Sequence, residues 1–496
     1  MRESGILMHI TSLPGRWGVG TMGREAFRFV DFLKASGQRC WQILPLTPTG
    51  YGDSPYQSSS AFAGNHYLID LDILVEKGLL EQQELEGFDW GRSQSRVDYG
   101  SLYTHKLAVL SKAYERFADK RALDAFCREN GSWLPDYCLF MALKAKHQGE
   151  PWYRWPHKLK FREPDAIWQA RQELKAEIRF YSFVQYLFFE QWNALRTYAK
   201  EKGVRIIGDV PIYVPYDSVE VWSSPECFQL DKSAEPTMVA GCPPDAFSED
   251  GQLWGNPLYR WDAMKLDGYS WWIRRLKAAS RLYDVIRIDH FRGLESYWAV
   301  PYGDKTAKNG HWVKGPGMDF IQAIQNRLPK ISLIAEDLGF LTPEVLQLRD
   351  EAGYPGMKVL GFAFDSREPS DYLPHSYCSN TVCYTGTHDN MTTRQWFETA
   401  PADAVAYAQE YMHLTREEGF VWGMIRTAFS SVSDLCIIPM QDYLQLGAEA
   451  RMNFPGTQSG DNWTWRAAPG YATPELTKRI YALTRLYGRL GDPYKL

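Results

Sequence analysis

Eight short apolar segments recur along the 496 residues, and most of them end in polar or ionisable side chains followed by Gly, Pro or Asn. Such segments are typical of buried parallel strands. They are Gly5–Leu13, Cys40–Leu46, Val204–Val214, Val285–Phe291, Leu333–Leu338, Lys358–Asp365, Thr381–Asp389 and Asp434–Met440. Helical patterns, such as Arg24–Ser36 and Ile178–Lys202, lie between them. The alternation predicts an α/β fold of the (β/α)8 TIM barrel type.

Two stretches are too long to be ordinary loops of such a barrel. Residues 62–202, after the second strand, carry helical signals of their own at Tyr103–Phe126 and Tyr137–Lys146. Residues 216–261, after the third strand, are rich in Pro, Gly, Ser and Asp. We therefore expect one catalytic barrel over residues 1–496, with an inserted helical subdomain at 62–202 and an inserted loop region at 216–261. Both insertions leave the carboxyl ends of strands, where barrel enzymes carry their chemistry.

Charge and composition exclude several classes of partner. The chain has 55 basic and 60 acidic side chains and a net charge of -5, a poor match to nucleic acid or to an anionic membrane surface. The N-terminus lacks the apolar region of a signal peptide, and no run approaches the about 18 apolar residues of a spanning helix. The eight cysteines form no Cys-x-x-C pair. We expect a soluble cytoplasmic protein that binds neither nucleic acid nor membrane.

One glycine motif suggests a nucleotide. Gly18, Gly20 and Gly23 spell G-x-G-x-x-G between a predicted strand and a predicted helix, as in a dinucleotide-binding fingerprint. The second strand, however, ends in Leu46, Thr47 and Pro48, with no acid to bind a ribose hydroxyl. We therefore favour the alternative, a flexible turn that lets the chain approach the cleft.

Four carboxylates stand at strand ends, namely those of Asp209, Asp289, Glu336 and Asp389. Because side chains alternate along a strand, Arg287 and Asp289 share one face and point into the same end of the barrel. The two could form a buried structural ion pair. Four carboxylates at one barrel mouth instead favour glycoside chemistry, in which one acid attacks the anomeric carbon and another protonates the leaving oxygen.

A metal-assisted hydrolase is a rival interpretation, because four histidines also lie near strand ends: His9, His66, His290 and His388. No two of them have the i, i+2 or i, i+4 spacing of paired ligands. We expect each histidine to donate a hydrogen bond to substrate or to be a satisfied core residue. The sequence therefore predicts no metal and no cofactor.

Five longer motifs follow the strands or fill the second insertion: GYGDSPYQ (Gly50–Gln57), PPDAFSEDGQLWGNPLY (Pro243–Tyr259), RIDHFRG (Arg287–Gly293), IAEDLG (Ile334–Gly339) and GTHDN (Gly386–Asn390). Together they resemble the 4-α-glucanotransferases called amylomaltases or disproportionating enzymes, family 77 of the glycoside hydrolases. The resemblance runs from Gly5 to about Trp465. It implies a compact form without a trailing β-sandwich domain. VPIYV follows Asp209 in place of the Asn-His pair of many amylases, so no structural calcium is expected.

The resemblance implies a role for each of three acids. Asp289 would be the nucleophile that forms a glucosyl ester, Glu336 the general acid and base, and Asp389 the stabiliser of the transition state. The implied reaction is the transfer of α-1,4-glucan segments from a donor to the 4-hydroxyl of an acceptor glucan or glucose. It would proceed by a retaining double displacement, with the Asp289 and Glu336 carboxyls about 5 to 5.5 Å apart.

The resemblance also implies a set of substrate-binding residues, in which Arg287 would keep Asp289 ionised and residues 243–254 would close over the acceptor. The set is Tyr56, Asp209, Asp245, Phe247, Trp254, Arg287, His290, Asp365, His388 and Asn462. Trp463, beside Asn462, is a further aromatic candidate for the cleft. The expected partners are α-1,4-glucans and maltooligosaccharides, as donor and acceptor. Two alternatives stay open, a hydrolase with the same three acids and a non-catalytic glucan-binding protein, and the sequence does not fix the oligomeric state.

Overall fold

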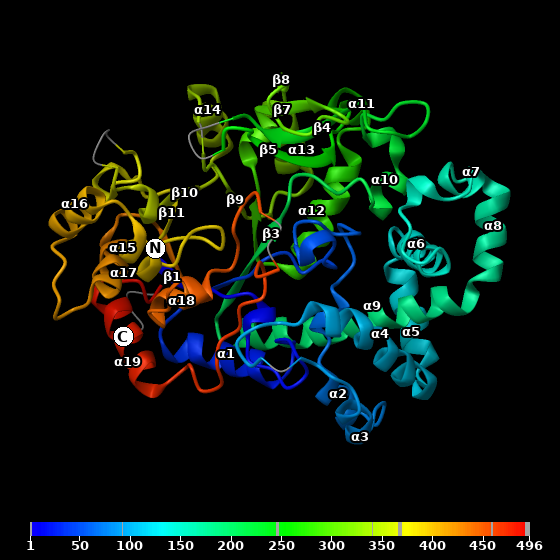
Figure 1. Cartoon of the computed structure of the whole chain (residues 1–496), viewed down its shortest axis with the longest axis horizontal. Coiled ribbons are helices and arrows are strands. Elements are labelled where there is room, and N and C mark those ends of the chain that lie inside the picture. Colours follow the sequence, from blue (N-terminus) through cyan, green and yellow to red (C-terminus); the bar gives the residue numbers. More distant parts are fainter. Residues whose placement is uncertain are drawn as a thin grey trace.

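A computed structural model of the chain describes residues 2–91, 93–244, 248–339, 341–365, 370–457 and 460–491. Figure 1 shows the barrel strands at the centre, with helices around them and a group of helices, α4 to α8, projecting to one side. None of the helices within the described residues combines the length and the apolar composition needed to cross a membrane.

The central sheet has eight parallel strands in the order β10-β11-β12-β1-β2-β3-β6-β9. Its two edges meet where the Ala335 N–H donates to the Pro355 carbonyl at 3.0 Å, so the sheet is a nearly closed barrel. The strands are β1 (Glu3–Leu7), β2 (Cys40–Gln42), β3 (Arg205–Val210), β6 (Val285–Ile288), β9 (Leu333–Ala335), β10 (Gly356–Val359), β11 (Thr381–Tyr384) and β12 (Leu435–Pro439). The predicted TIM barrel is confirmed. Each strand is shorter than its apolar segment.

Apolar side chains decide how these strands pair. Ile6 on β1 is level with Trp41 on β2 and with Ile438 on β12, and all three are fully buried. A strand buried on both faces needs apolar residues in consecutive positions, which is why the sequence shows runs rather than alternation.

Amphipathic helices cover the outside of the barrel. In α1 (Arg24–Ala35), the buried residues Ala26, Phe29, Val30 and Leu33 recur at helical spacing and face the sheet. The other covering helices are α9 (Lys175–Glu201), α12 (Ser270–Leu282), α13 (Gly317–Arg327), α14 (Pro343–Ala352), α15 (Thr393–Thr399), α16 (Ala402–Met412), α17 (Phe420–Ser430), α18 (Met440–Tyr443) and α19 (Pro474–Leu486).

The eightfold alternation of strand and helix is incomplete. Between β10 and β11, the described residues contain only the short 3-10 helices η7 (Leu360–Phe362) and η8 (Pro374–Ser376), and no α-helix. The expected helix is therefore absent from the described part of this connection.

Residues 62–202 hold a group of helices that ends with α9. The helical signals expected at Tyr103–Phe126 belong to two helices, because the chain leaves the first at Phe117 and Asp119 caps the second by accepting from the Ala122 N–H. The helices are α2 (Leu71–Glu76), α3 (Gln82–Glu86), α4 (Tyr99–Arg116), α5 (Lys120–Glu129), α6 (Leu134–Lys146), α7 (His157–Lys160) and α8 (Pro164–Glu173).

The expected loop region at 216–261 has more regular structure than its composition indicates. It contains α10 (Val219–Ser223), β4 (Met238–Cys242), β5 (Gln252–Pro257) and the start of α11 (Trp261–Leu266). A second sheet forms from these strands and two others, β7 (Ser296–Pro301) and β8 (His311–Lys314), in the antiparallel order β5-β4-β7-β8. The last two strands follow β6, so the sheet joins segments that are distant in sequence.

The G-x-G-x-x-G turn is tightly packed and not a flexible approach to the cleft. A Cβ added at Gly20 would lie 2.0 Å from the Ile10 carbonyl oxygen, and one at Gly23 would lie 1.9 Å from a carboxylate oxygen of Asp70. Gly18 has φ +77°, and a Cβ added there would lie 2.2 Å from the Trp90 carbonyl oxygen. These glycines are therefore required by the close approach of other protein atoms.

Candidate active site

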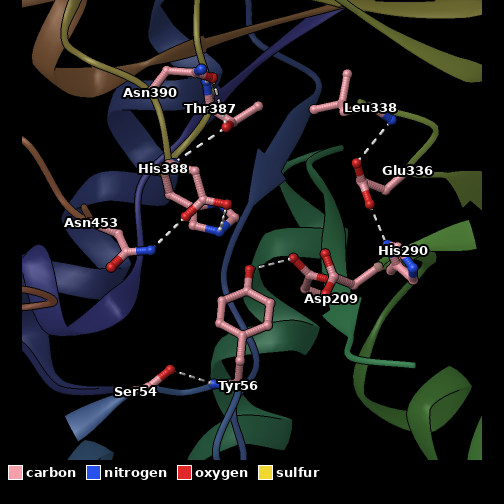
Figure 2. A network of polar contacts seen from close by, with 12 residues as sticks. Ser54, Tyr56, Asp209, His290, Glu336, Leu338, Thr387, His388, Asn390 and Asn453 are labelled. Atoms are coloured by element: carbon pink, nitrogen blue, oxygen red, sulfur yellow. Dashed lines mark hydrogen bonds and ion pairs between the residues drawn. The ribbon is translucent and has the colours of Figure 1, made fainter. Parts of the chain in front are cut away.

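Four acidic residues meet at the carboxyl end of the barrel. Asp209 is the next-to-last residue of β3, Asp289 follows β6, Glu336 follows β9, and Asp389 lies in the loop after β11. Figure 2 shows Asp209, Glu336 and their partners around one space, with Tyr56 reaching into it from the loop after β2. The convergence expected from the strand ends is therefore observed.

Arg287 joins two of these acids. Its Nη1 lies 2.6 Å from Oδ2 of Asp209 and 3.0 Å from Oδ1 of Asp289. The Arg287 side chain is 4% exposed and that of Asp209 1%, whereas that of Asp289 is 28% exposed and open to a ligand. Burial alone would lower the pKa of Arg287, but the two carboxylates raise it well above its ordinary value. The guanidinium thus stays charged beside both carboxyls.

Tyr56 connects this ion network to the loop after β11, which holds His388. Its hydroxyl donates to Oδ2 of Asp209 at 2.8 Å, and its ring stacks on His388 with centroids 5.3 Å apart. Trp463 packs against the same two rings, at 5.7 Å from Tyr56 and 5.9 Å from His388. The three rings form an aromatic wall beside Asp389, a suitable surface for the apolar face of a sugar.

Glu336 is held by backbone donors. One carboxylate oxygen accepts from the His290 N–H at 2.6 Å and the other from the Leu338 N–H at 3.0 Å. The residue is only 9% exposed. Burial raises the pKa of Glu336 to about 8; the charge of Arg287 opposes this shift and that of Asp289 adds to it. Glu336 is therefore protonated at neutral pH and able to donate a proton.

The backbone of His290 is strained. Its φ of 51° and ψ of 50° place it in the left-handed region, which is uncommon for a residue other than glycine. His290 directly follows Asp289, and its left-handed conformation directs its N–H to Glu336. Burial lowers the pKa of His290 to about 3 and also lowers that of His388, so both imidazoles are neutral at neutral pH.

Asp389 lies in a loop that its neighbours hold in place. Its Oδ1 accepts from Asn453 Nδ2 at 2.6 Å, and its Oδ2 lies 3.4 Å from His388 Nε2. Its carbonyl accepts from Arg451. The Asp389 side chain is still 43% exposed, so it can reach a ligand. Neither Asn453 nor Arg451 was predicted from the sequence, since neither lies in a strand-end motif.

Trp254 faces the site from β5. Its ring meets His290 edge to face, with centroids 4.8 Å apart, and its indole N–H donates to the side chain of Gln252. Tyr213 lies 6.3 Å from Trp254, between centroids, and was missed because it sits inside the apolar segment of the third strand. These rings form a second aromatic surface, beside His290.

The remaining predicted residues have different positions. Asp365 lies half-buried after η7, next to residues that are not described. Asn462 is 5% exposed and holds its own loop, accepting from the Phe454 N–H and donating to the Thr457 carbonyl. Asp245 and Phe247 lie outside the described residues.

Metal ligation was the rival interpretation of the histidines. Among the described residues, no group of three or more His, Cys, Asp or Glu side chains is placed to hold a metal ion. His9 has a structural role instead, because its Nδ1 accepts from the Leu44 N–H at 3.3 Å.

Comparison with known proteins decides the family. A family model described as 4-alpha-glucanotransferase, of glycoside hydrolase family 77, matches residues 8–472. The chain belongs to this family. A 4-alpha-glucanotransferase of Clostridium butyricum is 50% identical over 486 residues, which cover 97% of this chain and 100% of the relative. One of Thermus thermophilus is 50% identical over 502 residues, 99% of each chain.

A solved structure agrees with this family. The amylomaltase from Streptococcus agalactiae in complex with acarbose has a TM-score of 0.96 and 42% identity, over 99% of this chain and 100% of that chain. Family membership confirms the predicted 4-α-glucanotransferase activity and the predicted barrel.

Replacing Arg287 with Met tests the ion network. The substitution leaves the buried Asp209 without its counter-ion, so we expect the free energy of unfolding to fall by about 3 to 5 kcal/mol. Denaturant unfolding measures this change. Arg28→Met, which removes a pair with Glu25 between exposed side chains, is the control and should change stability little. Equal effects of the two substitutions would show that Arg287 is not the essential counter-ion of Asp209.

Glu336→Gln tests the raised pKa through stability. Glu336 has a pKa of about 8 in the folded protein against an ordinary 4.5. Between these two pH values its carboxyl is ionised in the unfolded chain but protonated in the folded protein, so the wild type loses stability as the pH rises through this range. The Tm of Glu336→Gln relative to the wild type should therefore increase across that range. Glu84→Gln is the control, since hydrogen bonds from Arg116 lower the pKa of Glu84 to about 2 and its Tm difference should stay flat. A flat difference for Glu336→Gln would contradict the assignment.

Proposed function

We propose that the protein transfers α-1,4-glucan segments to the 4-hydroxyl of an acceptor glucan or glucose by a retaining double displacement. Asp289 attacks the anomeric carbon and forms an ester, while Glu336 gives its proton to the departing glycosidic oxygen. Glu336, now ionised, takes the proton of the acceptor 4-hydroxyl, whose oxygen attacks the ester and releases Asp289. Two inversions at one carbon retain the α configuration.

The contrast between two carboxyls carries this proposal. Glu336 is buried with a pKa raised to about 8, whereas Asp289 is more exposed and lies 3.0 Å from a guanidinium nitrogen. A buried carboxyl with a raised pKa supports Glu336 as the proton donor, and an exposed carboxyl paired with a guanidinium supports Asp289 as the nucleophile. Asp209 already provides a buried partner for Arg287. This argues against a purely structural role for Asp289.

Asp389 would stabilise the transition state. Asn453 holds one of its carboxylate oxygens, and the exposed fraction of 43% leaves room for sugar hydroxyls. Hydrogen bonds to an oxocarbenium-like ring strengthen as positive charge develops at the anomeric carbon.

The aromatic surfaces would hold sugars on the two sides of the reacting bond. Tyr56 with His388 would cover the donor ring, and Trp254 with His290 would support the acceptor. Neutral imidazoles can donate or accept hydrogen bonds to hydroxyls. Asp209 and Arg287 would act through Asp289 rather than on the sugar, given their burial. Asp245, Phe247, Asp365 and Asn462 stay proposed contacts that rest on the family motifs.

The two insertions would form walls of the cleft within one catalytic domain. Trp254, from the 216–261 insertion, lies beside His290 and supports this view. We also propose that the enzyme works in the cytoplasm, because its thiols at Cys40, Cys138, Cys383 and Cys436 are buried and free, which suits a reducing compartment.

Maltotriose as the sole substrate separates transfer from hydrolysis. We expect glucose together with oligosaccharides longer than maltotriose, because a sugar held on the acceptor side competes with water for the ester. Chromatography of the products and a reducing-end assay measure both outcomes. Only glucose and maltose, with a matching rise in reducing ends, would show a hydrolase instead.

Substitution of the two acids tests their roles. Glu336→Gln should lose on the order of 10² to 10⁴ in rate on maltotriose, and Asp289→Asn should abolish ester formation. In the wild type, kcat/KM should fall as the pH rises through about 8, when Glu336 loses the proton it must donate.

A maltosyl fluoride is the control, because fluoride leaves without a proton. Glu336→Gln should form the ester from it at a rate closer to the wild type, whereas Asp289→Asn should not. Near-normal turnover of maltotriose by either variant would overturn the corresponding role.

A further inference from the structure

The seam of the barrel lies beside the general acid of the proposed reaction. β9 and β10 are the two ends of the sheet order, and they form no ladder in the part of the chain that the structure describes. The Ala335 N–H crosses the seam to the Pro355 carbonyl at 3.0 Å, and Glu336 is the next residue. On its β10 side, the chain at Glu336 therefore lacks the evenly spaced ladder that joins parallel strands.

On its other side, Glu336 is held by regular pairing. Its N–H donates to the Ile288 carbonyl at 3.0 Å, and its carbonyl accepts from the Phe291 N–H at 2.9 Å. Both bonds continue the parallel pairing of β6 with β9. The main chain of Glu336 is therefore fixed relative to β6, and a second anchor toward β10 is required to fix it on both sides.

The side chain of Asp337 supplies this anchor. Its Oδ1 accepts from the Met357 N–H at 2.7 Å, and Met357 is the second residue of β10. Its Oδ2 accepts from Nη1 of Arg349, on α14, at 2.6 Å. The Asp337 side chain is 2% exposed and that of Arg349 is 13% exposed, so both contacts are only weakly screened by salt.

The Asp337 carboxylate also fits closely against β10. A Cβ added at Gly356 would lie 2.4 Å from Asp337 Oδ2, so the close approach requires glycine at this position. Bonds from a main-chain N–H or a guanidinium to a carboxylate are charge-assisted and stronger than bonds between neutral groups. Asp337 thus takes the place of a ladder bond at the seam.

We propose that Asp337 is a positioning residue for Glu336, which fixes the carboxyl of the acid by closing the barrel seam next to it. The inference rests on the proposed role of Glu336 as proton donor. A carboxyl must lie within about 2.6 to 3.2 Å of the oxygen that it protonates. A displacement of about 1 Å can slow a catalysed step about 10²-fold. A loose seam therefore weakens proton transfer more than it weakens sugar binding.

Asp337→Ala in the full chain tests this role. We expect kcat for maltotriose to fall about 10- to 100-fold with KM within about threefold of the wild type, because the sugar contacts stay in place. Fluoride release from maltosyl fluoride in a single turnover should stay within about threefold of the wild type, since that step needs no proton from Glu336. A purely structural role predicts equal losses on the two substrates.

Asp337→Asn is a conservative second variant, in case the alanine variant does not fold. Its amide oxygen can still accept from the Met357 N–H, but the ion pair with Arg349 is lost. We expect kcat for maltotriose to fall about 3- to 10-fold, less than in Asp337→Ala, with fluoride release unchanged. Thermal denaturation checks that each variant is folded at the assay temperature.

Asp350→Asn is the matched control. Asp350 pairs with the same guanidinium, at 2.6 Å from Arg349 Nη2, but its side chain is 65% exposed. An exposed pair contributes little, so this variant should behave as the wild type on both substrates.

The two proposals fail in different ways. A wild-type kcat for maltotriose in either folded Asp337 variant, or equal losses on maltotriose and maltosyl fluoride, would overturn the role of Asp337. Neither result changes the role of Glu336, which Glu336→Gln tests on the same two substrates. Near-normal turnover of maltotriose by Glu336→Gln would instead overturn the proton donor itself.

Discussion

The ion pairs of Arg287 are the constraint on which the active end of the barrel depends. A guanidinium in an almost dry position needs carboxylates around it, and the neighbouring strand β3 supplies Asp209 while the end of β6 supplies Asp289. Asp209 in turn receives the hydroxyl of Tyr56, so a residue from the loop after β2 is fixed by the same charge. One cation thus joins two strand ends directly and a loop through Asp209.

The sequence predicted this region well because the required information is local. The alternation in VIRIDHF places Arg287 and Asp289 on one face, and parallel strands bring their carboxyl ends together. Asn453, Arg451 and Tyr213 were not predicted, because their approach to Asp389 and Trp254 depends on how distant loops fold back. No period or motif in a single sequence encodes that contact.

The second sheet could not be predicted from the sequence for the same reason, because it joins distant segments. Its strands β4 and β5 come from the insertion after β3, and β7 and β8 come from the connection after β6. Each pair alone is a short ribbon with little stability, so neither segment shows a strong strand signal. Together they carry Trp254 to His290, and this side of the site is therefore built from two connections of the barrel.

Glu336 is tied to its neighbourhood through the main chain, by the N–H groups of His290 and Leu338. A donor that belongs to the backbone is present whatever side chain the position carries, proline excepted. The position of the Glu336 carboxyl is thus protected against most single substitutions at either donor position. Side chains around Glu336 can therefore diverge, while the position of its carboxyl is kept with the fold.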